Sequence, residues 1–189
     1  MAAGLARTGL PAMVQSHVSP IATALGEGGV ALEELKRLQA DLLPNGLWPC
    51  GGNPCIESTL GMTNIVQNML VQSWSDPANE EPGPIRIIPA LPSIWKDVEF
   101  HDLCTEGAFL VSAKRTAGKT KWVRIKSLAG EPCRVRTDLP GQIDFKGARQ
   151  FKLELISPGI CQIDLKKGEE ILLLAEANAY TPSSASGSK

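Results

Sequence analysis

The chain has 189 residues, of which 43% are hydrophobic and 21% charged, as in a globular protein of one ordinary domain or two small ones. Its 19 basic and 20 acidic residues give a net charge of −1, which argues against a nucleic-acid binder. The sequence has no run of about 20 apolar residues, so no membrane-spanning helix is predicted. With two histidines and five cysteines, none of them in a CxxC pair, we expect no metal site, no cofactor, and thiols that are buried or free.

The N-terminal part of the chain is predicted to be helical. Its first residues lack the regions of a signal peptide, which predicts a cytoplasmic protein if Met1 is the true start. Over residues 31–43, leucines recur at helical spacing with charged residues opposite them. Glycines at 28–29 end whatever precedes this helix, and Pro44 ends the helix itself.

The loop over residues 45–61 is the best candidate site, because it is rich in glycine and proline and contains a single carboxylate, Glu57. Glycines let the backbone approach a ligand, and Trp48 offers a stacking face. A carboxylate just ahead of a helix is kept ionised by the helix dipole, as a general base requires. The alternative is that Glu57 only caps a helix within a turn-rich connector.

A second helix is predicted over residues 59–74, capped by Ser58 or Thr59, and it carries no charge between Glu57 and Asp76. Its amides and hydroxyls suit a helix packed on several sides, where each polar group needs a partner. The chain has too few helices to cover it, which indicates an incomplete architecture. An exposed groove is then expected along its apolar stripe, lined by Met62, Ile65 and Met69.

After an acidic, proline-rich connector, the apolar pattern changes to a period of two. Turn signals recur about every 8–12 residues, which is typical of an antiparallel β-sandwich. The clearest hairpin joins 109–114 to 121–126 through a turn at 117–119. The other predicted strands are 85–88, 133–136, 151–155, 163–165 and 170–174, and the Ser-rich end is expected to be disordered.

Two further clusters are more simply explained as surface features. His101 and Asp102 suggest a base with its orienting group, but neighbours in a strand point to opposite faces. A basic stretch on the hairpin could hold an anionic partner, although such runs are usually solvated. It comprises Lys114, Arg115, Lys119, Lys121, Arg124 and Lys126.

Three stretches follow the order of a known family's motifs: residues 56–61 (IESTLG), 69–74 (MLVQSW) and 85–92 (IRIIPALP). They resemble I-D-x-N-F-G, M-L-L-Q-S and a strand ending L-P-A-L-P, in the C-terminal part of glycoside hydrolase family 95. That family contains inverting α-L-fucosidases and α-L-galactosidases. The segment 123–135, with its G-x-P-C turn between two strands, resembles the terminal β-domain of the same family.

The resemblance implies an α+β fold, with partial (α/α)6-barrel helices followed by an antiparallel β-sandwich. The implied units are 1–76 for the last barrel helices, 77–84 for a linker, 85–177 for the sandwich and 178–189 for the tail. It also implies that a base carboxylate directs water to the anomeric carbon of a terminal sugar while a separate Glu acts as general acid.

The family's base, an Asp, falls on Glu57, and its following Asn and Phe fall on Thr59 and Leu60. Trp48, Asn53 and Thr59 are the expected substrate-binding residues. The acid and the asparagines that activate the water would lie before Met1, so the chain is expected to be inactive alone. Its expected partners are a glycan and the missing N-terminal barrel.

The alternative is a non-catalytic β-sandwich module that binds carbohydrate or a protein partner. Such a module should show aromatic residues clustered on one sheet face. The aromatic residues of the predicted sandwich are scattered, and most alternate as core residues. They are Trp95, Phe100, Phe109, Trp122, Phe145 and Phe151.

Overall fold

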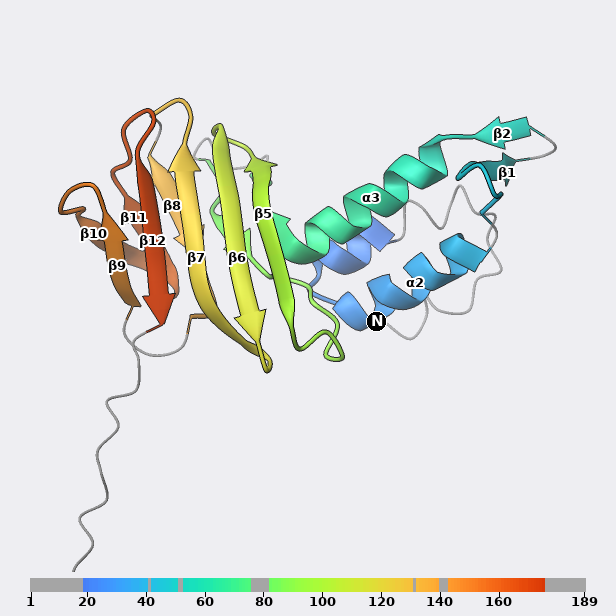
Figure 1. Ribbon diagram of the computed structural model, residues 1–189, viewed down its shortest axis with the longest axis horizontal. Coiled ribbons are helices and arrows are strands. Elements are labelled where there is room, and N and C mark those ends of the chain that lie inside the picture. The colour runs from blue at the N-terminus through green and yellow to red at the C-terminus, as the bar shows by residue number, and fades with distance from the viewer. Residues whose placement is uncertain are drawn as a thin grey trace, which may run out of the picture.

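A computed structural model of the chain describes residues 19–40, 42–50, 53–75, 82–130, 132–139 and 143–175. A helical part and a β-sandwich lie side by side along the long axis of the molecule (Figure 1). Within the described ranges, no helix has the length and apolar character needed to cross a membrane.

The helical part contains α2 (Gly28–Ala40) and α3 (Glu57–Leu70), with a short helical segment at 19–24. Apolar side chains from all three form a small core. Its buried members are Ala22, Ala31, Leu32, Leu38, Ile65 and Met69. The expected exposed groove along α3 is therefore wrong, because Ile65 and Met69 are fully buried within this chain and Met62 packs against them half-buried.

Gly28 begins α2 instead of ending the helix before it. A Cβ atom at this position would collide with the backbone of Ala90 and Leu91, so glycine lets the start of α2 pack against the segment that follows β4 (Ile85–Ile87). The helix ends at Ala40, three residues before the predicted end.

α3 begins and ends earlier than predicted. Neither Ser58 nor Thr59 caps it: the residue before it is Ile56, without a side-chain cap, and the Thr59 hydroxyl donates to the Gly46 carbonyl oxygen at 2.7 Å. At its other end Val71 turns to extended backbone, and β3 (Val71–Gln72) pairs with β4. Pairing with β4 thus overrides the helical periodicity at residues 71–72, and the chain does not return to a helix at 73–74.

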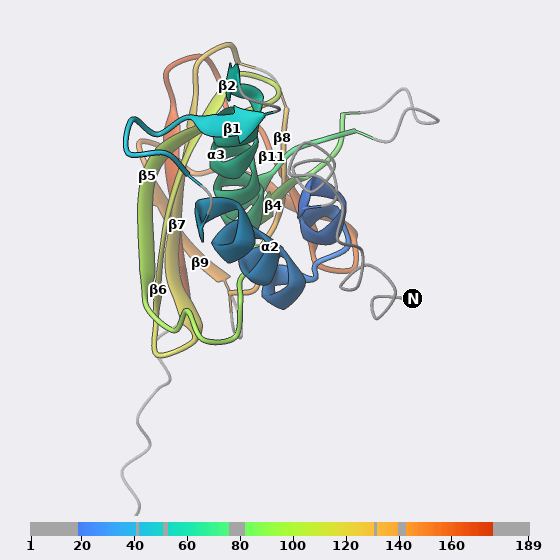
Figure 2. The ribbon, with the colours of Figure 1, turned by 90° about the vertical axis from the view of Figure 1, so that its right-hand side faces the viewer.

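The sandwich consists of two five-stranded sheets, one ordered β10-β11-β8-β4-β3 and the other β5-β6-β7-β12-β9. The first contains β8 (Cys133–Arg136), β10 (Leu153–Ser157) and β11 (Ile160–Ile163) beside β3 and β4. The second contains β5 (Val98–Thr105), β6 (Phe109–Thr116), β7 (Lys119–Ser127), β9 (Ile143–Gly147) and β12 (Glu170–Ala175). Figure 2 shows the two layers, with β5, β6 and β7 on one side and β4, β8 and β11 on the other.

Aliphatic side chains from both sheets fill the space between the layers. Fully buried examples are Ile85, Val111, Val123, Ile125, Ile163, Ile171 and Leu173. Among the strands that the structure describes, all pairs are antiparallel except β4 with β8, which run parallel. The predicted antiparallel sandwich is thus confirmed, and so is the hairpin of β6 and β7, whose turn residues Ala117 and Gly118 have φ of 51° and 75°.

Candidate functional site

The candidate loop forms a small hairpin at the end of the helical part that lies away from the sandwich (Figure 1). Its strands are β1 (Trp48–Cys50) and β2 (Asn53–Cys55), which pair antiparallel with Trp48 opposite Cys55. The chain then enters α3 at Glu57. The sequence predicted an irregular loop here, and the structure instead has a two-stranded ribbon leading into a helix.

This corner brings the backbone of the predicted site residues together. Asn53 begins β2 opposite Cys50, Trp48 lies opposite Cys55, and Glu57 follows two residues after Cys55. The bond from Thr59 to Gly46 ties the first turn of α3 to the segment just before β1. The side chains of Trp48 and Asn53 lie outside the described part of the structure, so their substrate-binding role stays a prediction.

Glu57 is an exposed residue in the first turn of α3, a helix of 14 residues. The positive end of the helix dipole favours the ionised carboxylate at this place. Ile56 and Leu60 beside it are 56% and 61% exposed. An inverting site needs a second carboxyl group about 6.5–9.5 Å away, and the segment 45–61 contains no other. Within residues 45–61, Glu57 is therefore the only candidate for a general base, and no second carboxyl group is available in that segment to act as the acid.

His101 and Asp102 do not form a catalytic pair. The His101 ring lies against Trp122, with centroids 6.1 Å apart, and its Nε2 is 3.3 Å from Glu99. Asp102, with φ of 52°, accepts a hydrogen bond from Arg124 at 2.7 Å. Each residue thus has its own partners, which agrees with their interpretation as surface groups.

Three of the six basic residues of the hairpin form ion pairs with described acidic residues of the chain. Lys114 contacts Glu99 at 2.8 Å and Arg124 contacts Asp102 at 2.7 Å, so strand β5 supplies acids to two cations of β6 and β7. Arg115 pairs with Asp138, which follows β8. The sequence shows no acid near this stretch because its counter-ions lie on other strands.

The thiols with described side chains do not form a reactive or metal-binding centre. Burial raises the pKa of the Cys133 thiol to about 12 and also raises the pKa of Cys161, so both favour the protonated form. Cys104, Cys133 and Cys161 are all free. Among the described residues, no three His, Cys, Asp or Glu side chains are grouped so that they could hold a metal ion.

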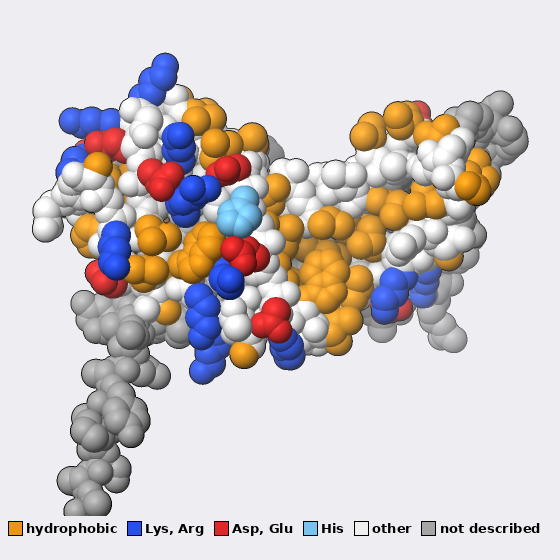
Figure 3. All heavy atoms as spheres, viewed as in Figure 1, with side chains coloured by type: hydrophobic (Ala, Val, Ile, Leu, Met, Phe, Trp, Pro, Cys, Tyr) orange, Lys and Arg blue, Asp and Glu red, His pale blue; other side chains and the backbone are white. Residues whose placement is uncertain are grey.

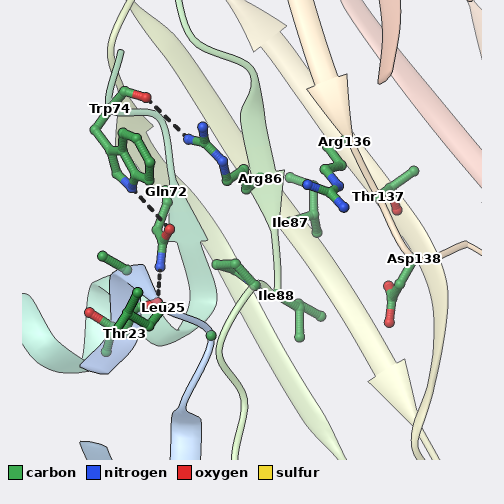
Figure 4. A pocket seen from close by; sticks show the side chains of 13 residues that line it. Thr23, Leu25, Gln72, Trp74, Arg86, Ile87, Ile88, Arg136, Thr137 and Asp138 are labelled. Atoms are coloured by element: carbon green, nitrogen blue, oxygen red, sulfur yellow. Dashed lines mark hydrogen bonds between the residues drawn. The ribbon is translucent and has the colours of Figure 1, made fainter. Parts of the chain in front are cut away.

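Sequence reasoning missed a pocket of about 670 Å³ between the segment at 23–26, the strands β3 and β4, and the end of β8 (Figure 4). Arg86 and Arg136 line it together with Trp74. The two arginines are far apart in the sequence and meet because β4 and β8 pair in parallel. The sequence does contain one indication of this arrangement. Each arginine follows a buried aliphatic residue in a strand, and because side chains alternate, the arginine must lie on the outer face of the sheet.

Comparison with known protein families identifies the sandwich. Residues 80–173 match the family model of the glycoside hydrolase family 95, C-terminal domain. The chain carries this family-95 domain. The match includes β4 to β11 and most of β12, and it confirms the resemblance seen in the sequence. The Glu57 corner lies before the matched residues, and no curated protein matches the chain.

Proposed function

We propose that the chain is the C-terminal portion of an inverting glycoside hydrolase of the α-L-fucosidase type, which removes terminal sugars from glycans. The helices at 19–70 are then the last helices of an (α/α)6 barrel, and Glu57 is its general base. One observation carries this proposal: the family-95 C-terminal domain comes directly after the pair of helices α2 and α3. The strand β3, which follows α3, pairs with β4 and so joins the helices to that domain.

The surface of the helical part supports an interface with further helices. On α3 the residues Leu60, Thr63, Asn64 and Gln67 are exposed, and none of them is charged. A surface helix normally carries charged side chains there. Figure 3 shows that the visible face of the helical part is mostly apolar or uncharged, whereas the sandwich carries both signs of charge. Other exposed apolar side chains of this part are Ile21, Leu25 and Ile56.

The chemistry follows from the position of Glu57. Its carboxylate takes a proton from a water molecule as that water attacks the anomeric carbon, and a second carboxyl group, on the barrel helices before this segment, protonates the leaving oxygen. Glu57 is one methylene longer than the family's Asp, and Thr59 and Leu60 replace the family's Asn and Phe. These departures point to a different sugar or a shifted water within the same reaction class.

The first experiment determines the reading frame upstream of Met1 and compares two proteins on α-L-fucosyl and α-L-galactosyl oligosaccharides. Because the proposal places the general acid on helices before this chain, we expect no turnover by the 189-residue chain and turnover by a protein extended with an upstream helical region. A genuine start at Met1 with no upstream partner gene would end the proposal, as would hydrolysis by the chain alone.

The second experiment tests Glu57 in the extended protein. Glu57→Gln keeps the shape of the side chain but removes the base, so turnover should fall by roughly 10²–10⁴-fold while the glycan still binds. Glu33→Gln is the matched control, since Glu33 is an exposed carboxylate on α2 paired with Lys36. Retention of turnover by Glu57→Gln would remove Glu57 from the mechanism.

The alternative of a non-catalytic binding module has less support. Phe100, Phe109 and Phe151 are buried in the sandwich core, as expected from their alternation. Trp95 packs against the helical core. Among the described residues, the aromatic contacts at the surface are separate: Trp122 lies beside His101 on the sheet of β5, β6 and β7, and Trp74 stacks with Arg86 of β4. A glycan array with the 189-residue chain checks this alternative.

A further inference from the structure

Two arginines meet on the outer face of the sheet that contains β3, β4 and β8. The parallel pairing of β4 with β8 puts Arg86 opposite Arg136. Ile85, Ile87 and Val135, their neighbours along the strands, are buried in the sandwich core. Because side chains alternate along a strand, both arginines project to the outer side, and Figure 4 shows the Arg86 guanidinium directed toward Trp74 and the Arg136 guanidinium beside Ile87.

Arg86 is held in place by several contacts. Its Nη1 donates to the carbonyl oxygen of Trp74 at 3.1 Å, and its guanidinium carbon lies 4.0 Å from the centre of the Trp74 ring. The Trp74 indole donates in turn to Gln72, whose amide donates to the Thr23 carbonyl oxygen. Since Gln72 is buried, this chain of bonds fixes one wall of the pocket before any ligand arrives.

Arg136 has a different environment. It is exposed, and within the described ranges its side chain makes no hydrogen bond or ion pair. Burial lowers the pKa of Arg86, and the charge of Arg136 lowers it further. Like charges directly opposite each other on neighbouring strands repel. The pair is therefore an electrostatic cost to the free chain.

Among the described residues, the carboxylates near the two arginines are mostly engaged with other partners. Asp138 lines the pocket, but its oxygens accept hydrogen bonds from Arg115 and Thr120. Glu106 acts on Arg86 as a weaker influence than Arg136, and its carboxylate accepts a bond from Ser75 at 3.2 Å. The remaining lining includes the apolar residues Leu25, Ile88 and Pro89 and the hydroxyl-bearing Thr137.

We propose that this pocket binds a small molecule through an oxyanion group, a carboxylate, sulfate or phosphate, held between Arg86 and Arg136. Guanidinium groups bind such oxyanions through paired N–H donors. The volume of about 670 Å³ is in the range of small-molecule sites. The proposal does not depend on the proposed glycosidase function, because its residues are remote from the Glu57 corner (Figure 1).

Isothermal titration calorimetry of the 189-residue chain at low ionic strength tests the site with three probes. Glucuronate presents a carboxylate on a sugar ring, glucose is its neutral counterpart, and inorganic sulfate is the free anion. We expect glucuronate or sulfate to bind and glucose not to bind. If glucuronate binds more tightly than sulfate, the ligand of the pocket is an acidic sugar. If sulfate binds as tightly as glucuronate or more tightly, the ligand is a free inorganic anion.

The variant Arg136→Gln should weaken binding of the better probe about tenfold or more, since a charge-assisted pair of donors is lost. Arg136→Lys keeps the positive charge but not the paired N–H donors of the guanidinium group, so it should weaken binding by an intermediate factor. Arg134→Gln is the matched control: it lies two residues away on β8, outside the pocket, with its Nε bonded to Gln162 at 3.0 Å. It should bind like the unmodified chain.

Thermal unfolding separates this role from a structural one. Because Arg136 faces a like charge, Arg136→Gln should not lower the Tm of the free chain, and it should reduce the rise in Tm that the anion produces. Failure of both anions to bind overturns the proposal. So does equal binding by Arg136→Gln and the unmodified chain, or an equal loss with Arg134→Gln.

Discussion

Glu169, in the turn before β12, is the carboxylate with the clearest set of partners. Arg149 donates to both of its oxygens, from Nε at 2.8 Å and from Nη2 at 2.9 Å, and the backbone N–H of Lys166 donates at 2.9 Å. The bond from Arg149, followed by the one from Lys166, lowers the pKa of Glu169 from 4.5 to about 2. The same guanidinium lies 4.6 Å from the centre of the Phe151 ring, so the pair also covers the sandwich core.

This pKa shift predicts a pH dependence of stability. A carboxylate with a lowered pKa in the folded state stabilises the fold above its unfolded pKa, and that contribution is lost as the pH falls from about 4.5 toward 2. Glu169→Gln should therefore lower the free energy of unfolding at neutral pH and flatten its decline in acid. Urea unfolding at several pH values measures both, with Glu154→Gln on the exposed part of β10 as the control. Parallel acid profiles for Glu169→Gln and the unmodified chain would contradict the assignment.

At the scale of elements, the start of α2 depends on one glycine. A Cβ atom at residue 28 would collide with the backbone of Ala90 and Leu91, whereas one at residue 29 would meet nothing within 4 Å. Gly28→Ala should destabilise the chain by about 1–3 kcal/mol through overpacking. Gly29→Ala, the matched control, should be neutral or stabilising by up to about 1 kcal/mol because alanine favours a helix. Chemical denaturation followed by circular dichroism measures the difference, and equal effects would show that the close approach does not matter.

The elements that the sequence predicts are those whose pattern is local. The hairpin of β6 and β7 has clean alternation and a turn at Ala117 and Gly118. β5 was missed, since the register shift between Phe100 and Leu103 breaks its alternation. The end of α3 was misplaced because Val71 and Gln72 fit a helical stripe as well as a strand, and the presence of β4 decides between them.

The candidate site divides in the same way. Glu57 and Thr59 could be proposed from the sequence because they lie in a continuous motif, and the hairpin β1–β2 brings the backbone of Trp48 and Asn53 to the same corner through short-range pairing. The pocket with Arg86 and Arg136 depends on a parallel strand pair between distant segments. No local pattern reports such a pairing, so that site could be recognised only in the structure.

At the scale of the whole molecule, two hydrophobic cores are joined by hydrogen bonds from both backbone and side chains. The sandwich core and the core of α2 and α3 are separate clusters. Between them, the Ile88 N–H donates to the Leu70 carbonyl oxygen at 2.7 Å, and Gln72 donates to Thr23 at 2.8 Å. The helical part is thus fixed to the sandwich, while its outer face carries exposed apolar residues that include Leu60.

If barrel helices cover that face in a longer protein, one substitution should have two outcomes. Leu60→Glu should change the stability of the 189-residue chain by no more than about 0.5 kcal/mol, because Leu60 is 61% exposed and an acid suits the first turn of a helix. In the extended protein the same change buries a charge, so the free energy of unfolding should fall by several kcal/mol and turnover with it.

Leu155→Glu is the control for this prediction, since Leu155 is 69% exposed on β10 of the sandwich, away from the helices. It should be tolerated equally in both proteins. Unfolding curves of the two variants in the two proteins complete the test. If Leu60→Glu proves as harmless as Leu155→Glu in the extended protein, the exposed face of α3 is ordinary surface, and the barrel interpretation of the helical part is wrong.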